Sequence, residues 1–214
     1  MNNVNRKWKE IEWIFRPDGS LRDIYIQDTT IDDWNNLLDL LNDMYSVVFY
    51  SENSPNGIQK IDKKWVIENF KNNSGLRNYL KISIENININ CHFFLVDEIE
   101  FDLDPNEINS IDDYYLLESF MKEISKLLEK QITLTEEDEP EFPLLKIDSV
   151  NDVNLVMSFD EVIRLRNNSE SLFSSILKYK TMLEIKLMPN KFRDKLLKNA
   201  AKPHRPTKKG DNIW

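Results

Sequence analysis

The chain has 214 residues, of which 41% are hydrophobic and 11% aromatic, and its formal net charge is −9. These values are those of a globular protein with a sizeable core, and they exclude a disordered chain. The single cysteine excludes an intramolecular disulfide framework and suits a reducing cytosol. The N-terminus lacks the apolar core of a signal peptide, and no apolar run reaches the roughly 18 residues that a transmembrane helix needs. We therefore expect a cytoplasmic protein.

The charge is divided unevenly along the chain. Residues 176–214 carry eleven Lys or Arg and three Asp or Glu, which gives +8, whereas the rest of the chain carries −17. This asymmetry predicts an acidic body followed by a basic C-terminal segment. The basic segment could bind an external polyanion or fold back onto the acidic body.

Two strand-like runs near the N-terminus, residues 11–15 and 21–26, flank a Pro-Asp-Gly-Ser turn at 17–20. Proline presets φ for the first turn position and glycine allows φ > 0, so the pattern predicts a β-hairpin. Thr30, with Asp33 three residues later, resembles a capping box and predicts the start of a helix. Its apolar residues are spaced by three and four: Ile31, Trp34, Leu37, Leu38 and Leu41.

The next part of the chain predicts short elements. We expect strands at 45–50, 79–85 and 91–96, a loop at 51–57, and a helix that begins at Asp62. The run at 91–96 has the length and composition of a buried strand, and the Asn-rich residues before it suggest a connection.

Residues 98–104 form the clearest strand pattern. Four acids alternate there with three apolar residues: Glu98, Ile99, Glu100, Phe101, Asp102, Leu103 and Asp104. A period of two places the acids on one face and the apolar side chains on the other, as in a half-buried strand. Ser110 then caps a helix at 110–130, where apolar residues recur every three or four positions.

Beyond this helix we expect strands at 131–135 and 143–148. Ser158 and Glu161 form a capping-box pattern that predicts a helix to about residue 179. Residues 181–188 fit a strand or a continued helix, 191–201 predict a short basic helix, and 202–214 predict a mobile tail.

These elements predict an α+β fold, in which a mainly antiparallel sheet is packed by the long helix at about 110–130. A helical basic C-terminal extension follows. We divide the chain into an acidic α+β domain at 1–148, a helical extension at 149–201 and a flexible basic tail at 202–214.

The residues that common catalytic sites require are scarce. The four glycines are too scattered to form a Gly-rich phosphate loop, and two His with one Cys cannot form a zinc site of the usual type. Cys91 and His92 are adjacent, so on a strand they point to opposite faces and cannot form a nucleophile–base pair. We predict a protein that is not an enzyme and that binds no cofactor.

Two short, incomplete patterns leave a metal-dependent enzyme as a third hypothesis. The segment 102–113 begins with the Asp-x-Asp-x-Asn spacing of a calcium loop, but it has Glu107 and Asp113 where such a loop needs Gly and a bidentate Glu. An E-x-K pattern at 184–186 resembles a strand of metal-dependent nucleases, without the acid that a neighbouring strand must supply. We therefore predict no metal site.

Two dense groups of acids are the main candidates for a binding surface. From Asp97 to Glu118 the chain has nine acids and no Lys or Arg, and a second cluster lies at 136–141. A charge run is often only a solvated face, but dense carboxylates also steer a basic partner into rapid association. The candidate partner-binding residues are Asp97, Glu98, Glu100, Asp102, Asp104, Glu107, Glu136, Glu137, Asp138 and Glu139. Three aromatic residues nearby are possible anchors, although periodicity assigns the first to the core: Tyr114, Tyr115 and Phe142.

Three stretches, WIFRPDGSLRDIYIQDTT at 13–30, CHFF at 91–94 and FDLDPNE at 101–107, together resemble bacterial immunity proteins encoded beside polymorphic or contact-dependent toxins. The resemblance spans roughly Lys7–Asp148. It implies a protein that binds and neutralises a cognate toxin. Immunity families share no catalytic residues, so none is transferred to this chain.

The sequence therefore predicts a non-catalytic binding protein, most simply an immunity protein that neutralises a basic toxin domain through an acidic face. The alternative is a nucleic-acid-associated protein that acts through its basic C-terminal region. The candidate residues for that alternative are Lys202, Arg205, Lys208, Lys209 and Trp214.

Overall fold

A computed structural model of the protein describes residues 3–51, 54–72 and 78–169. The chain divides into two units, Met1–Leu165 and Arg166–Trp214, and the sheet and helices described below belong to the first. None of the described helices combines the length and the apolar composition that crossing a membrane requires.

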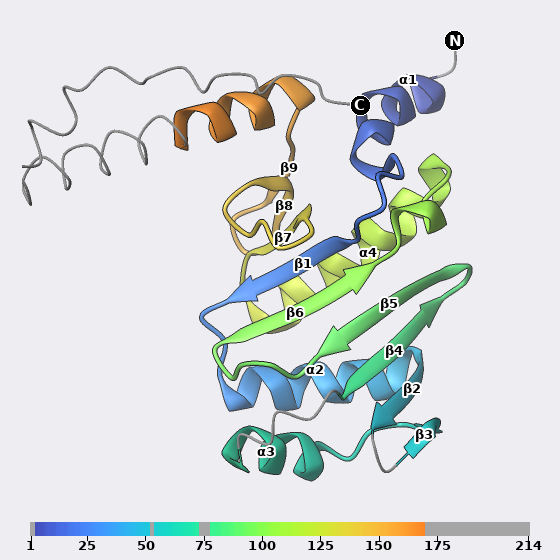
Figure 1. Ribbon diagram of the computed structural model, residues 1–214, viewed down its shortest axis with the longest axis vertical. Coiled ribbons are helices and arrows are strands. Elements are labelled where there is room, and N and C mark those ends of the chain that lie inside the picture. The colour runs from blue at the N-terminus through green and yellow to red at the C-terminus, as the bar shows by residue number, and fades with distance from the viewer. Residues whose placement is uncertain (1–2, 52–53, 73–77, 170–214) are drawn as a thin grey trace, which may run out of the picture. The chain divides into compact units, whose positions relative to one another are not determined.

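The described residues form nine strands in one antiparallel sheet, in the order β3-β2-β4-β5-β6-β1-β7-β8-β9 (Figure 1). The strands are β1 (Arg22–Gln27), β2 (Ser46–Ser51), β3 (Ser54–Gln59), β4 (Tyr79–Ile84), β5 (Ile87–His92), β6 (Glu98–Leu103), β7 (Ile132–Glu136), β8 (Pro143–Asp148) and β9 (Val153–Val156). The predicted α+β class and the antiparallel sheet are confirmed. The sheet continues past residue 148, because β9 pairs with β8.

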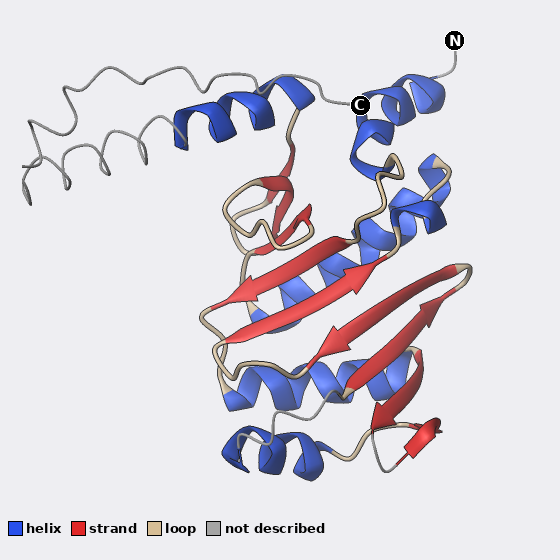
Figure 2. Ribbon diagram, viewed as in Figure 1, coloured by secondary structure: helices blue, strands red, loops and turns tan. Residues whose placement is uncertain are grey.

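Helices cover one side of the central strands. The described helices are α1 (Asn3–Ile11), α2 (Ile31–Met44), α3 (Lys63–Asn72), α4 (Ile111–Leu128) and a helix over residues 159–169, with short 3-10 turns η1 (Glu12–Phe15) and η2 (Pro105–Glu107). Figure 2 shows α2 and α4 behind strands β1, β6, β5 and β4, and none of the described helices lies in front of these strands. The long helix predicted at 110–130 is confirmed as α4, whereas the C-terminal segments predicted from residue 170 onward lie outside the described residues.

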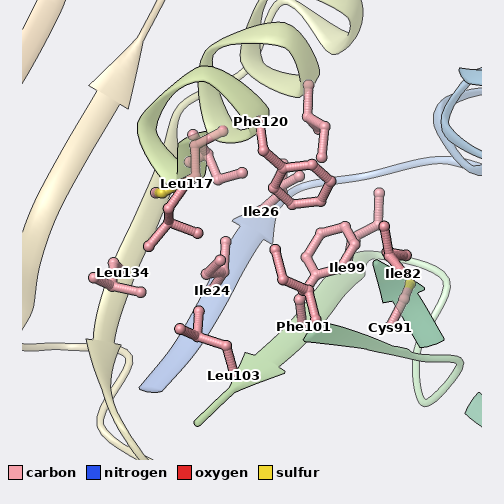
Figure 3. Close-up of a cluster of buried hydrophobic side chains, with 14 of the residues drawn as sticks. Ile24, Ile26, Ile82, Cys91, Ile99, Phe101, Leu103, Leu117, Phe120 and Leu134 are labelled. Carbon is pink, nitrogen blue, oxygen red and sulfur yellow. The ribbon is translucent and has the colours of Figure 1, made fainter. Parts of the chain in front are cut away.

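The core lies between the sheet and the two helices α2 and α4. The apolar residues of β6 are fully buried, and the Phe101 ring meets the Phe120 ring of α4 edge-on, with centroids 5.6 Å apart. Ile24 and Ile26 of β1 line the same layer (Figure 3). The alternation predicted for residues 98–104 is therefore confirmed, because the acids and the apolar residues of β6 face opposite sides of the sheet.

The predicted helix caps are also confirmed. Thr30 and Asp33 form a capping box at the start of α2, and the Ser110 hydroxyl accepts from the backbone N–H of Asp113 at 3.2 Å. Ser158 caps the helix that begins at residue 159 in the same way. Caps are local interactions between residues three apart, which is why the sequence reveals them.

The predicted N-terminal hairpin is wrong. Residues Glu12–Phe15 form a 3-10 helix, and β1 pairs with β6 and β7 instead. The Arg22 side chain, only 2% exposed, donates to the carbonyl oxygens of Ile14 (2.7 Å) and Arg16 (3.1 Å). A strand at 11–15 would use such carbonyls in a ladder and leave the buried guanidinium without these acceptors.

Two further boundaries differ from the prediction. The expected loop at 51–57 contains most of β3, and the strand expected at 91–96 lies earlier, as β5, with a loop from residue 93. In β5, Asn88 and Asn90 alternate with buried Ile87, Ile89 and Cys91, so the polar residues that suggested a connection are the outward face of a strand.

Replacing Phe101 by Ala should lower the free energy of unfolding by about 3–5 kcal/mol, because it leaves a cavity against Phe120. Urea denaturation of both proteins measures this difference. Met44→Ala, at an exposed position of α2, is the control and should change stability by less than about 1 kcal/mol. A small loss for Phe101→Ala would contradict the assignment of β6 to the core.

Candidate partner-binding surface

The side of the sheet that faces away from α2 and α4 carries polar side chains at alternate positions. We call this surface the polar sheet face. It is formed by Asp23, Tyr25 and Gln27 of β1, Tyr79 and Lys81 of β4, Asn88, Asn90 and His92 of β5, and Glu98, Glu100 and Asp102 of β6. Because β6 lies between β5 and β1, its carboxylates meet side chains from both neighbours.

His92 and Asp102 form a hydrogen-bonded pair on this face. His92 Nε2 lies 2.5 Å from Asp102 Oδ2, and Asn90 Nδ2 donates to Asp102 Oδ1 at 2.7 Å. Both oxygens of the carboxylate are therefore engaged, and the imidazole ring is held in one orientation. Glu100 lies directly across from His92 in the register of β5 and β6.

Asp23 and Tyr25 form a second, buried pair beside these residues. Asp23 is 3% exposed and Tyr25 is 6% exposed. The Tyr25 hydroxyl donates to Asp23 Oδ2 at 2.9 Å, and the backbone N–H of Asp138 donates to the same oxygen at 2.8 Å. Asp138 belongs to the turn between β7 and β8, so this turn lies against the polar sheet face next to β1.

Burial and mutual repulsion shift the ionisation of these groups. Burial is the main cause that raises the pKa of Glu100 to about 7, and repulsion from the Asp23 carboxylate is the second. Burial also raises the pKa of Asp23, although its hydrogen bonds from Asp138 and Tyr25 oppose that shift. The pKa of Tyr25 is raised by burial and by its hydrogen bond to Asp23. The ionised carboxylates on this face therefore lower the stability of the folded chain, and an adjacent cation would reduce that loss.

The structure brings the two predicted acidic clusters together at this point. Three acids of the first cluster lie on β6, and Asp138 of the second cluster contacts Asp23. Glu137 lies in the same turn, and its carboxylate accepts from the backbone N–H of Leu21 at 3.2 Å. Glu136 ends β7, and Glu139 is half-buried in the turn.

The remaining predicted acids lie at the ends of β6. Asp97 is exposed in the loop before the strand, and its backbone carbonyl accepts from Thr29 N–H at 2.9 Å. Asp104 follows the strand and caps η2. The Glu107 carboxylate accepts from the side-chain amide of Asn88 at 2.8 Å, at the margin of the polar sheet face. The predicted tail residues 202–214 lie outside the described residues.

The structure also places Cys91 and the residues of the calcium-loop pattern. Cys91 is fully buried on the helix side of the sheet, so its predicted separation from His92 is confirmed. Burial raises the pKa of its thiol well above the usual value. Asp102 bonds His92 while Asp104 caps η2, so the two do not converge as calcium ligands would. Within the described residues, no three His, Cys, Asp or Glu side chains are grouped as a metal site.

A row of aromatic rings crosses the face, and sequence reasoning missed it. The Tyr50 ring of β2 stacks on the Tyr79 ring, with centroids 5.0 Å apart. The centroids of the Tyr79 and His92 rings are 6.4 Å apart, and the His92 ring stacks on the Phe94 ring with centroids 4.9 Å apart. We call these four residues the aromatic row. The aromatics expected as anchors lie elsewhere: Tyr114 is buried in the core, Tyr115 lies on α4, and Phe142 is half-buried in the turn between β7 and β8.

The surface beside Tyr25 is only slightly hollowed. A depression of about 230 Å³ lies there, lined by Tyr25, Gln27, Asp28, Lys130, Gln131 and Thr133. Pockets for small molecules typically enclose about 300–1,000 Å³. This depression is therefore smaller than a typical small-molecule pocket.

Comparisons with known proteins add no relative to this picture. No protein-family model matches the chain, and searches of curated proteins and of solved structures found no significant match. The function must therefore be argued from the geometry of the chain itself.

Glu100→Gln should stabilise the protein in a pH-dependent manner. The ordinary pKa of 4.5 applies in the unfolded chain, whereas the folded value is about 7, so ionising Glu100 lowers stability as pH rises through this window. The substitution removes that cost. Thermal denaturation should show little change near pH 4.5 and a gain of about 1–2 kcal/mol at pH 8, after allowance for solvent screening. An equal effect at both pH values would contradict the raised pKa.

Proposed function

We propose that the protein is a binding protein that neutralises a basic protein partner, most simply a cytoplasmic immunity protein that inhibits a cognate toxin. The observation that carries the proposal is the convergence of acids from β1, β6 and the turn between β7 and β8 on the side of the sheet opposite α2 and α4. This proposal agrees with the resemblance of residues 7–148 to immunity proteins.

Electrostatics support a basic protein as the partner. Burial is the main cause of the raised pKa values of Asp23 and Glu100, repulsion from the Asp102 carboxylate adds to both shifts, and repulsion from Asp23 adds to that of Glu100. A positively charged side chain placed among these carboxylates would offset both effects and would be steered toward them over a long range. The small size of the depression beside Tyr25 further favours a partner that covers a large area.

The nucleic-acid hypothesis remains an alternative with a different location. It depends on residues 202–214, which the structure does not describe. The polar sheet face itself opposes a nucleic acid, because phosphates would lie against carboxylates. Binding of DNA or RNA that is lost when residues 202–214 are removed would support this alternative.

Co-expression with a candidate toxin encoded by a neighbouring gene tests the proposed function. The chain should protect cells from that toxin and co-purify with it. The absence of both protection and binding would contradict the proposal.

Neutralising the three acids of β6 together with the adjoining Asp104 should slow association with this partner. The variant combines Glu98→Gln, Glu100→Gln, Asp102→Asn and Asp104→Asn, which keep side-chain shape and remove charge. Stopped-flow measurements at pH 8 should show an association rate about tenfold lower at low salt and a flatter salt dependence. Circular dichroism and urea denaturation check that the variant folds.

The matched control removes charge from the helix side of the sheet. Asp43→Asn with Glu68→Gln alters exposed positions of α2 and α3. This control should associate almost as fast as the parent protein. Equal association rates for the parent and the β6 variant would show that the acids are only a solvated surface.

A further inference from the structure

The aromatic row ends at an exposed ring. Phe94 is 60% exposed, and its ring lies nearly parallel to the His92 ring, with an interplanar angle of 8°. Leu95, next to it, is 52% exposed. Exposed apolar side chains that adjoin stacked rings are typical of a contact surface rather than of a solvated loop.

His92 joins the aromatic row to the carboxylates. Tyr79 and His92 are directly paired between β4 and β5, and His92 and Glu100 are directly paired between β5 and β6. Asp102 holds the His92 ring from the side, at 2.5 Å. Flat ring faces and anionic oxygens therefore stand side by side on one surface. Lys81, in register with Asn90, is the base on the β4 side of this surface.

We propose that this junction recognises arginine side chains of the partner, so that a guanidinium stacks on the face of the Phe94 ring that His92 leaves uncovered while Glu100 and Glu98 accept its hydrogen bonds. The proposal rests on the proposed function, since it names the chemistry by which the basic partner is recognised. It adds that the partner is rich in exposed arginine rather than in lysine.

Shape and charge together select arginine. The guanidinium is planar, stacks on aromatic rings and presents a fork of N–H donors that fits carboxylates, whereas the lysine ammonium is a compact and strongly hydrated charge. Each cation–π contact adds to this preference, and more so where the contact excludes water. Nucleic-acid bases also stack on rings, but their phosphates would be repelled by the three acids of β6.

Titration of the full chain with short peptides tests the inference. The probes are hexa-arginine, hexa-lysine and a six-nucleotide single strand, each followed by isothermal calorimetry at pH 8 and low salt. Hexa-arginine should bind about fivefold or more tightly than hexa-lysine. Phe94→Ala should remove this preference and leave hexa-lysine binding unchanged, while Glu98→Gln with Glu100→Gln should weaken both peptides. Met44→Ala, an exposed position on the helix side, is the control that should change neither.

Several results would overturn the inference without touching the proposed function. Equal affinity for the two peptides, or no binding of either, would mean that the face recognises no arginine, although the toxin partner could still bind and be neutralised. Tighter binding of the oligonucleotide would point to nucleic acid. Concentration-dependent self-association that Phe94→Ala abolishes would point to a second copy of the chain. Failure of the co-expression experiment instead would contradict the proposed function itself.

Discussion

The division of β6 between two environments is the constraint on which the rest of the structure depends. Its apolar side chains are buried under α4, with Phe101 against Phe120, and its acids must therefore point to the other side. Because β6 is a central strand, those acids cannot reach open solvent at a sheet edge. They meet His92 on one neighbouring strand and Asp23 on the other. The packing of the core thus decides which groups gather on the polar sheet face.

The clustering of these carboxylates on the polar sheet face lowers the stability of the folded chain. The raised pKa values of Asp23 and Glu100 are a measure of carboxylates held against burial and against each other. Sequences that serve only folding avoid such conflicts, whereas binding sites commonly retain them. The same surface adds exposed Phe94 to the charges. Both features are explained if a basic partner covers this face.

The sequence predicts those parts of the fold that depend on local or periodic patterns. The alternation of β6, the caps at Thr30 and Ser110 and the long helix α4 are all visible in residues close along the chain. The role of Arg22 is not visible, because it depends on carbonyls that only the folded N-terminal segment presents. The aromatic row is not visible in the sequence for a related reason. The Tyr79 ring meets Tyr50 and His92 because of the strand register, which a single sequence does not specify.

The central claim is that the polar sheet face, and not the helix side, contacts the partner. Hydroxyl-radical footprinting of the full chain, alone and with a basic protein partner that it binds, tests this claim directly by measuring side-chain accessibility. Tyr79, His92 and Phe94 should become protected in the complex, whereas Met44 and Tyr115 on the helices should react as before. Protection of Met44 and Tyr115 with unchanged reactivity of Phe94 would contradict the account.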